Sequence, residues 1–181
     1  MNNPTLREML NAYHPDAPEE REYKKTILAF IEQYPDDCFK RTLEVGHITG
    51  SAWLVSKDGS KALLMHHAKL NKWFQLGGHC DGNPDVLAVA IKEAQEESGI
   101  MGIIPVHKNI FDIDIHLIPA NSREKEHYHY DIRFLLKVTS DELVTQNSES
   151  KALSWVNKSL AELPTDSLSV VRMFKKWVAH E

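Results

Sequence analysis

The sequence contains little cysteine and no long apolar run, and both deficits limit the class of protein. The two cysteines, Cys38 and Cys80, lie far apart and form no Cys-x-x-Cys pair, which argues against a disulfide scaffold or a cysteine-based structural zinc site. No apolar stretch reaches the roughly 20 residues that cross a bilayer. Residues 1–8 lack the basic start and apolar core of a signal peptide. We therefore expect a cytoplasmic protein with no membrane partner.

Basic charge is also scarce. Lys and Arg number 21 against 26 Asp and Glu, which gives a formal net charge of −5. The basic pairs Lys24-Lys25 and Lys175-Lys176 are isolated and form no stripe of the kind that binds nucleic acid. A chain of 181 residues, 42% of them hydrophobic, is typical of one globular domain. We expect a single structural unit with no nucleic-acid partner.

The first forty residues have the punctuation of two helices. Pro4-Thr5 is typical of the start of a short helix, and Pro18-Glu19-Glu20 of the start of a longer one that ends at Tyr34-Pro35. Acidic residues in the first turn suit the helix dipole. We interpret residues 1–44 as a helical appendage packed on the core and residues 45–181 as the main domain.

Strand-like segments follow this appendage, and their hydrophobic patterns predict an α/β protein with a mixed sheet between helices. The segment 48–56, a turn at 57–60 and the run 62–65 predict a hairpin. The other predicted strands are 112–117, 127–134 and 152–156, and a final helix is expected around 170–177.

Two of these predicted strands alternate between apolar and polar residues. Their polar faces carry acids and histidines: Asp112, Asp114 and His116, then His127, His129, Asp131 and Arg133. The histidines could line a pocket or face solvent, and Asp131 could simply pair with Arg133 or a neighbouring strand. We expect no zinc site from the histidines, because their spacing fixes no tight ligand set.

A helix in the middle of the chain ends in a cluster of acids. Asn83 suits the N-cap, Pro84 the first helical position and Gly99 the residue past the end. Before that end, carboxylates stand at the i, i+3 and i+4 positions Glu93, Glu96 and Glu97, and so share one face. They repel one another and oppose the helix dipole, at roughly 0.3–1 kcal/mol each when exposed.

Such a face can be merely solvated, but a half-buried one requires a cation. Hard oxygen ligands suit Mg²⁺ or Mn²⁺. Gly77-Gly78 precedes the helix by a short loop, and glycines there allow the backbone to approach a ligand closely. This context favours a metal site over a solvated helix face.

At this point the sequence resembles the Nudix (MutT-like) hydrolases, whose box reads G-x5-E-x7-R-E-U-x-E-E-x-G-U, with U aliphatic. The frame runs without a gap from Gly78 to Ile100. It departs from the box twice, with Pro84 in place of the first Glu and Lys92 in place of the Arg. Lys92 supplies charge but not the two-pronged geometry of a guanidinium.

Three segments around the box look like a poorly characterised subgroup with a Gly-Gly-His loop: Gly46-His47-Ile48-Thr49-Gly50-Ser51, His67-x-Lys69, and Trp73-x-Gln75-x-Gly77-Gly78-His79. The resemblance covers roughly residues 45–160. It implies the α/β/α sandwich of the family, with a mixed sheet.

The resemblance also implies a ligand set and a mechanism. Glu93 and Glu97 would be catalytic and would bind Mg²⁺ (Mn²⁺ is possible), with Glu96 and the carbonyl of Gly77 completing the site. The family draws its general base from the box or from a later loop. Glu93 is the box candidate, and the later candidates are Glu124, Glu126 and Asp131, of which Glu124 and Glu126 could be solvated loop charges.

Candidate substrate-binding residues surround this set. They are His67, Lys69, Trp73, Gly78, His79 and Asp131. Three of them have a structural alternative: a surface position for Lys69, core packing for Trp73, and a hydrogen bond within the loop for His79.

The resemblance implies hydrolysis of a diphosphate bond in a nucleoside diphosphate linked to another moiety. The enzyme would act on a small molecule as a monomer or homodimer. One alternative is an enzyme like isopentenyl-diphosphate isomerase, for which Cys80 would be the catalytic thiol. The other is a non-catalytic nucleotide sensor. The sequence leaves the substrate class open.

Overall fold

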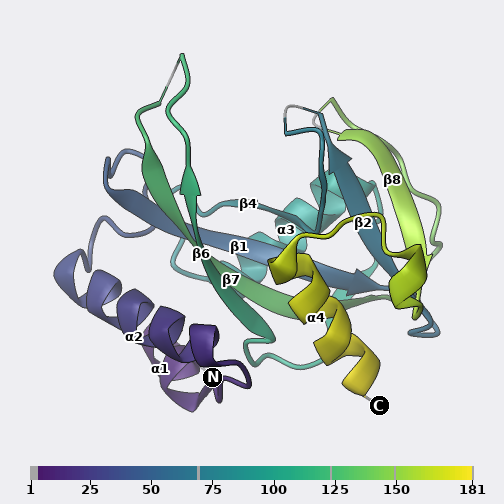
Figure 1. The fold of residues 1–181 in the computed structure, drawn as a ribbon, viewed down its shortest axis with the longest axis horizontal. Coiled ribbons are helices and arrows are strands. Elements are labelled where there is room, and N and C mark those ends of the chain that lie inside the picture. The colour runs from purple at the N-terminus through teal and green to yellow at the C-terminus, as the bar shows by residue number, and fades with distance from the viewer. Residues whose placement is uncertain (1–3, 69, 123, 149, 181) are drawn as a thin grey trace.

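An eight-stranded mixed sheet forms the centre of the computed structural model, which describes residues 4–68, 70–122, 124–148 and 150–180 (Figure 1). Its strands are β1 (Gly46–Val55), β2 (Lys61–His67), β3 (Trp73–Phe74), β4 (Leu76–His79), β5 (Ile103–Pro105), β6 (Asp112–Ile118), β7 (His127–Val138) and β8 (Ser150–Asn157). The mixed sheet expected from the sequence is confirmed. The short strands β4 and β5 were not predicted, because their four and three residues are too few to show a pattern.

The path through the sheet is β3-β2-β1-β7-β5, with β4 paired to β1, β6 to β7 and β8 to β2. The β1–β7 pair is parallel, and the other pairs are antiparallel. The predicted hairpin between β1 and β2 is present, with Leu54 opposite Leu63. The parallel pair is the long one, since ten residues of β1 are in register with β7 from Gly46 opposite Tyr128 onward.

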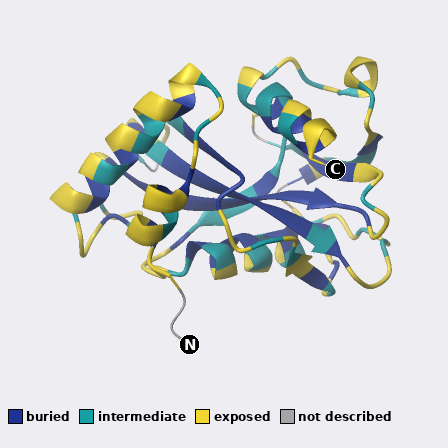
Figure 2. Ribbon diagram, turned by 90° about the horizontal axis from the view of Figure 1, so that it is seen from below, coloured by how far each residue is buried: buried dark blue, intermediate teal, exposed yellow. Residues whose placement is uncertain are grey.

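Helices cover both sides of this sheet (Figure 2). Helix α3 (Val86–Ser98) packs on β1, where a Cβ on Gly50 would lie only 2.9 Å from the carbonyl oxygen of Val86. Helix α4 (Leu168–Ala179) packs on the opposite face. It follows a short 3-10 turn, η1 (Leu160–Glu162). None of the helices among the described residues is long and apolar enough to span a membrane.

The N-terminal helices α1 (Leu6–Ala12) and α2 (Pro18–Gln33) join the same hydrophobic core as the sheet. Phe30 stacks on Tyr130 of β7, with ring centroids 4.0 Å apart. Both helices begin where the sequence predicted, and Thr5 caps α1 by accepting a hydrogen bond from the Glu8 amide. The division into units 1–44 and 45–181 stays a prediction.

The predicted start of α3 was wrong by two residues. The cap is Asp85, whose carboxylate accepts a hydrogen bond from the Ala88 amide at 3.0 Å. Asn83 instead accepts a hydrogen bond from the Asp85 amide and closes a turn over Pro84. The predicted C-terminus is confirmed, since Gly99 has φ +76°, a conformation that favours glycine.

The polar faces of β6 and β7 are buried and carry a network of ion pairs. The fully buried Arg133 donates to Asp131 at 2.7 Å, Asp112 at 2.9 Å and Asp114 at 3.2 Å. The pairing of Asp131 with Arg133 that the sequence allowed is therefore confirmed. From α4, Arg172 and Lys176 also donate to Asp112. Lys176 further binds Glu20 and Tyr13, which ties α4 to the N-terminal helices.

These cations determine the charge state of the buried acids. Burial alone would raise the pKa of Asp112, but hydrogen bonds from Arg172 and the charges of Arg133 and Lys176 outweigh it, so the pKa is lowered. Asp114 behaves in the same way, with Arg133 as the main opposing charge. Both groups therefore stabilise the fold above the unfolded-state pKa of about 3.9, and this stability is lost as the pH falls below it.

We predict that Arg133→Ala lowers the free energy of unfolding by about 3–5 kcal/mol, because it leaves buried carboxylates without a counter-charge. Urea denaturation at neutral pH measures this change. The matched control is Arg41→Ala, which removes an exposed pair with Asp81 and should cost about 1 kcal/mol or less. Equal losses in the two variants would contradict a central role for Arg133.

The same network predicts an acid-sensitive fold. The free energy of unfolding should fall as the pH drops from about 4 towards 2. In Asp114→Asn the slope should be shallower by up to about 1.4 kcal/mol per pH unit, one proton's contribution. Urea titrations at several pH values measure this slope in the wild type and in Asp114→Asn, and equal slopes would contradict the prediction.

Candidate active site

The acidic end of α3 lies against the glycines of β4. The Gly77 amide donates a hydrogen bond to Glu97 Oε2 at 2.8 Å, and Glu97 is buried, with 3% of its surface exposed. A charged carboxylate so far from water requires donors or a cation. The predicted proximity of Gly77 and Glu97 is thus present, and a backbone amide holds one carboxylate oxygen.

The two glycines are needed for different reasons. A Cβ on Gly78 would lie 2.4 Å from Glu93 Oε2, so the carboxylate of Glu93 occupies the space that any other residue would fill. A Cβ on Gly77 would lie 2.7 Å from the Cα of Ser51 and 2.8 Å from the carbonyl oxygen of Gly50. Gly78 therefore makes room for a carboxylate, and Gly77 allows β4 to pair closely with β1.

Lys92 bridges the carboxylates of Glu93 and Glu96. Its Nζ lies 2.9 Å from Glu96 Oε2 and 3.2 Å from Glu93 Oε1. The hydrogen bond to Glu96, followed by the contacts with Glu93, raises the pKa of Lys92. Lys92 thus makes one contact with each of these two carboxylates of α3, and not the two-pronged contact of a guanidinium. Pro84, at the start of the segment, supplies no polar side chain.

The donor chemistry of this group fits a hard divalent cation. It consists of the carboxylates Glu93, Glu96 and Glu97 beside the backbone of Gly77, all of which offer the oxygen ligands that Mg²⁺ and Mn²⁺ prefer. The ammonium of Lys92 lies between Glu93 and Glu96, and the structure does not bring the oxygens of all three glutamates within 4.8 Å of one another. Glu93 is half-buried with its side chain 18% exposed, whereas Glu96 is largely exposed.

Asp131 is buried beneath the site, and protein groups donate hydrogen bonds to both of its carboxylate oxygens. It is 2% exposed and accepts hydrogen bonds from Thr49 at 2.9 Å, Ser51 at 2.7 Å and Gln75 at 3.2 Å, besides that of Arg133. Both carboxylate oxygens are engaged. In this structure Asp131 fixes β1 and the residue that precedes β4, and its direct contact with substrate stays a prediction.

His79 ends β4 and faces a group of histidines from other strands. Neighbouring ring centroids in the group lie 4.8–5.4 Å apart. Its members are His47, His79, His116, His127 and His129. Burial, reinforced by the neighbouring rings, lowers the pKa of His47 to about 4 and that of His129 to about 2. Burial and the charge of Arg41 lower the pKa of His79.

His47 belongs to a segment that carries the family resemblance, but it was not among the predicted site residues. It lies 80 residues before His127 in the chain, and only the pairing of β1 with β7 places His47 opposite His129. Period-two alternation shows which side chains share a face of one strand, but it carries no information on which strand lies next to it.

Among the described residues, the remaining candidates make no hydrogen bond to the carboxylates of α3 that the structure records, and Glu124 acts on His79 through its charge. His67 is at the end of β2, and Trp73 stacks on His66 at 5.0 Å and packs partly against the core, as its structural alternative proposed. Glu126 is exposed and Glu124 is half-buried in the loop before β7. Lys69 lies outside the described residues. A cavity of about 430 Å³ lies elsewhere, beside α1 and the end of α4.

Most of this chain matches a known protein family. The family model described as NUDIX domain matches residues 47–177. A NUDIX-family hydrolase from Clostridium perfringens is 26% identical at a TM-score of 0.55, over 75% of this chain and 98% of that one.

Two further solved structures share the fold. A C. elegans Ap4A hydrolase complex has a TM-score of 0.59 at 19% identity, over 74% of this chain and 96% of that chain. A MutT NUDIX hydrolase from Burkholderia pseudomallei has a TM-score of 0.55 at 21% identity, over 72% and 97%. A search of curated proteins returned no match.

We predict that Gly78→Ala and Gly77→Ala fail in different ways. Gly78→Ala should displace the flexible Glu93 carboxylate and weaken Mn²⁺ binding about tenfold or more, with a nearly normal melting temperature. Gly77→Ala meets backbone atoms of β1 and should destabilise the fold itself, by about 1–3 kcal/mol. Calorimetric Mn²⁺ titration and thermal melting separate the two, and identical behaviour of the variants would argue against this geometry.

Proposed function

Because this chain belongs to the Nudix family and is a hydrolase of pyrophosphate bonds, we propose that it hydrolyses a nucleoside diphosphate linked to another moiety, with Mg²⁺ or Mn²⁺ as its cofactor. The observation that carries this proposal is the buried Glu97, held by the Gly77 amide beside Glu93. Neither carboxylate position is explained by stability alone, because acids at a helix C-terminus oppose the dipole.

The residues proposed to hold the ion are Glu93, Glu96 and Glu97 with the carbonyl of Gly77. When bound, a divalent ion neutralises the diphosphate and lowers the pKa of an attacking water. The Gly77 amide restricts Glu97 to one orientation, and Lys92 does the same for Glu96. Preorganised ligands cost less to order when substrate arrives.

Glu93 is the proposed general base. In hydrolysis the water oxygen bonds to phosphorus, the bridging P–O bond breaks, and a proton of the water passes to a carboxylate. Glu93 is half-buried against Gly78 and keeps one oxygen within 3.2 Å of Lys92. Glu124 and Glu126 stay as later candidates on the loop before β7. Gly78 and His79 are the proposed contacts for phosphate oxygens, and His67, Lys69 and Trp73 the proposed contacts for the rest of the substrate.

The isomerase alternative finds no support. Cys80 is buried, and burial raises the pKa of its thiol, so it is kept as an inert thiol rather than a thiolate. The sensor alternative differs from the hydrolase only in turnover.

We further propose a cytoplasmic protein that acts on a small molecule as a monomer or homodimer.

We predict metal-dependent turnover of at least one diphosphate class. The panel comprises dinucleoside polyphosphates, nucleotide sugars, coenzyme A, nucleoside triphosphates and non-nucleotide diphosphates, each with Mg²⁺, Mn²⁺ or chelator. Glu97→Gln should lower kcat about a hundredfold or more, since a buried ligand charge is lost. Released phosphate is measured after coupling to a phosphatase, and Glu22→Gln on α2 is the control that keeps full activity.

Three outcomes distinguish the hypotheses. Turnover that requires metal and is lost in Glu97→Gln supports the hydrolase and names its substrate class. Metal-dependent binding of a panel compound without any turnover supports the sensor. An allylic product formed without phosphate release would revive the isomerase.

A further inference from the structure

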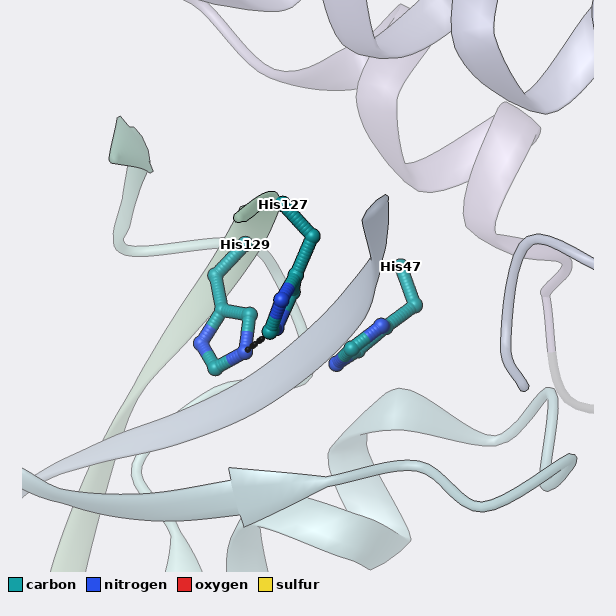
Figure 3. Close-up of side chains that lie close together, drawn as sticks. All are labelled: His47, His127 and His129. Atoms are coloured by element: carbon teal, nitrogen blue, oxygen red, sulfur yellow. Dashed lines mark hydrogen bonds between the residues drawn. The ribbon is translucent and has the colours of Figure 1, made fainter. Parts of the chain in front are cut away.

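Three histidines from two strands converge at the start of the parallel β1–β7 pair. His47 is the second residue of β1, and His127 and His129 begin β7. Figure 3 shows the rings side by side, His47 extending from one strand and the other two from its neighbour. One ring nitrogen from each lies within 4.8 Å of the others, the one such group of metal-binding side chains found among the described residues.

The burial of His47 is unusual for a polar side chain. Its exposure is 1%, and neither Nδ1 nor Nε2 has a hydrogen-bond partner. Buried polar groups are nearly always paired, so an orphaned imidazole calls for a specific explanation. A metal ion is one partner that satisfies a buried nitrogen lone pair.

His127 is already oriented as a ligand. Its Nδ1 lies 2.7 Å from the carbonyl oxygen of Lys125, which can only accept, so Nδ1 carries the proton and Nε2 presents a lone pair. A ligating histidine typically donates its other N–H in this manner. The lone pair of His127 Nε2 accepts a hydrogen bond from His129 Nε2, 3.2 Å away, and a bound ion would take the place of that proton.

The 3.2 Å between His127 Nε2 and His129 Nε2 matches the distance between two ligands of one metal ion. Two nitrogens bound tetrahedrally at about 2.0–2.1 Å from Zn²⁺ stand roughly 3.3–3.4 Å apart. The pair from β7 is therefore at ligand spacing, and the nitrogen of His47, within 4.8 Å of both, needs a movement of up to about 1.4 Å to complete the group. The strand pairing supplies the third ligand that sequence spacing alone did not provide.

We propose that His47, His127 and His129 form a binding site for a divalent transition ion of the Zn²⁺ class, with the fourth position left to water beside His79. Imidazole nitrogens select such ions over Mg²⁺, which takes oxygen ligands. The site is thus chemically distinct from the carboxylates of α3, and it does not depend on the proposed substrate. It would fasten β1 to β7 next to β4, which carries Gly78.

Cobalt absorption provides the test. Chelator-treated protein is titrated with Co²⁺, whose visible absorption is strong in tetrahedral nitrogen sites and weak at octahedral oxygen sites. We expect one equivalent of the strong signal in the wild type and in Glu97→Gln, displaced by Zn²⁺. In His129→Gln and His127→Gln the affinity should fall at least about a hundredfold. His14→Gln, which alters an exposed histidine, should bind like the wild type.

The unmodified protein gives a second measurement that does not depend on how the variants fold. One equivalent of Zn²⁺ should shift the imidazole nitrogen resonances of three histidines in long-range ¹H–¹⁵N spectra. Three outcomes would each overturn the proposal. They are histidine resonances that Zn²⁺ does not shift, a weak cobalt spectrum that only Glu97→Gln abolishes, and a strong cobalt spectrum that persists in folded His127→Gln and His129→Gln.

Discussion

The ion pair between Arg133 and Asp131 is the constraint on which the rest of the structure depends. A guanidinium on a residue that is only 1% exposed must be neutralised where it stands, and the Arg133 group reaches acids on β6 and on its own strand. The acids in turn require cations, which α4 supplies through Arg172 and Lys176. Sheet and helix are therefore held together by charges that cannot be removed singly.

The same pair connects the core to the candidate active site. Asp131 gathers the hydroxyls of Thr49 and Ser51 and the amide of Gln75. Gln75 immediately precedes β4, and Ser51 lies opposite Gly77 in the β1–β4 register. These buried polar contacts consequently fix the position of the Gly77 amide. The amide in turn orients Glu97 through its hydrogen bond.

Local signals in the sequence predicted most elements and the acidic helix end, because capping residues, glycines and carboxylate spacing act within a few residues. The start of α3 was misplaced, since Asn83 and Asp85 compete for the same role and only the turn at Pro84 decides between them. The burial of the polar face of β7 and the partnership of His47 with His129 could not be predicted. Both depend on pairings between strands, which alternation within one strand does not specify.

The parallel pairing of β1 with β7 also has a consequence for the order of folding. β1 finds β2 and β4 within a few tens of residues, but its other edge stays open until a strand some 80 residues later has been made. Closing so long a loop costs chain entropy before any contact is gained, which slows folding and leaves an unpaired edge in the interim. The histidines and Asp131 come together only when that pairing forms, whereas Gly77 and Glu97 are 20 residues apart in the chain and can meet without it.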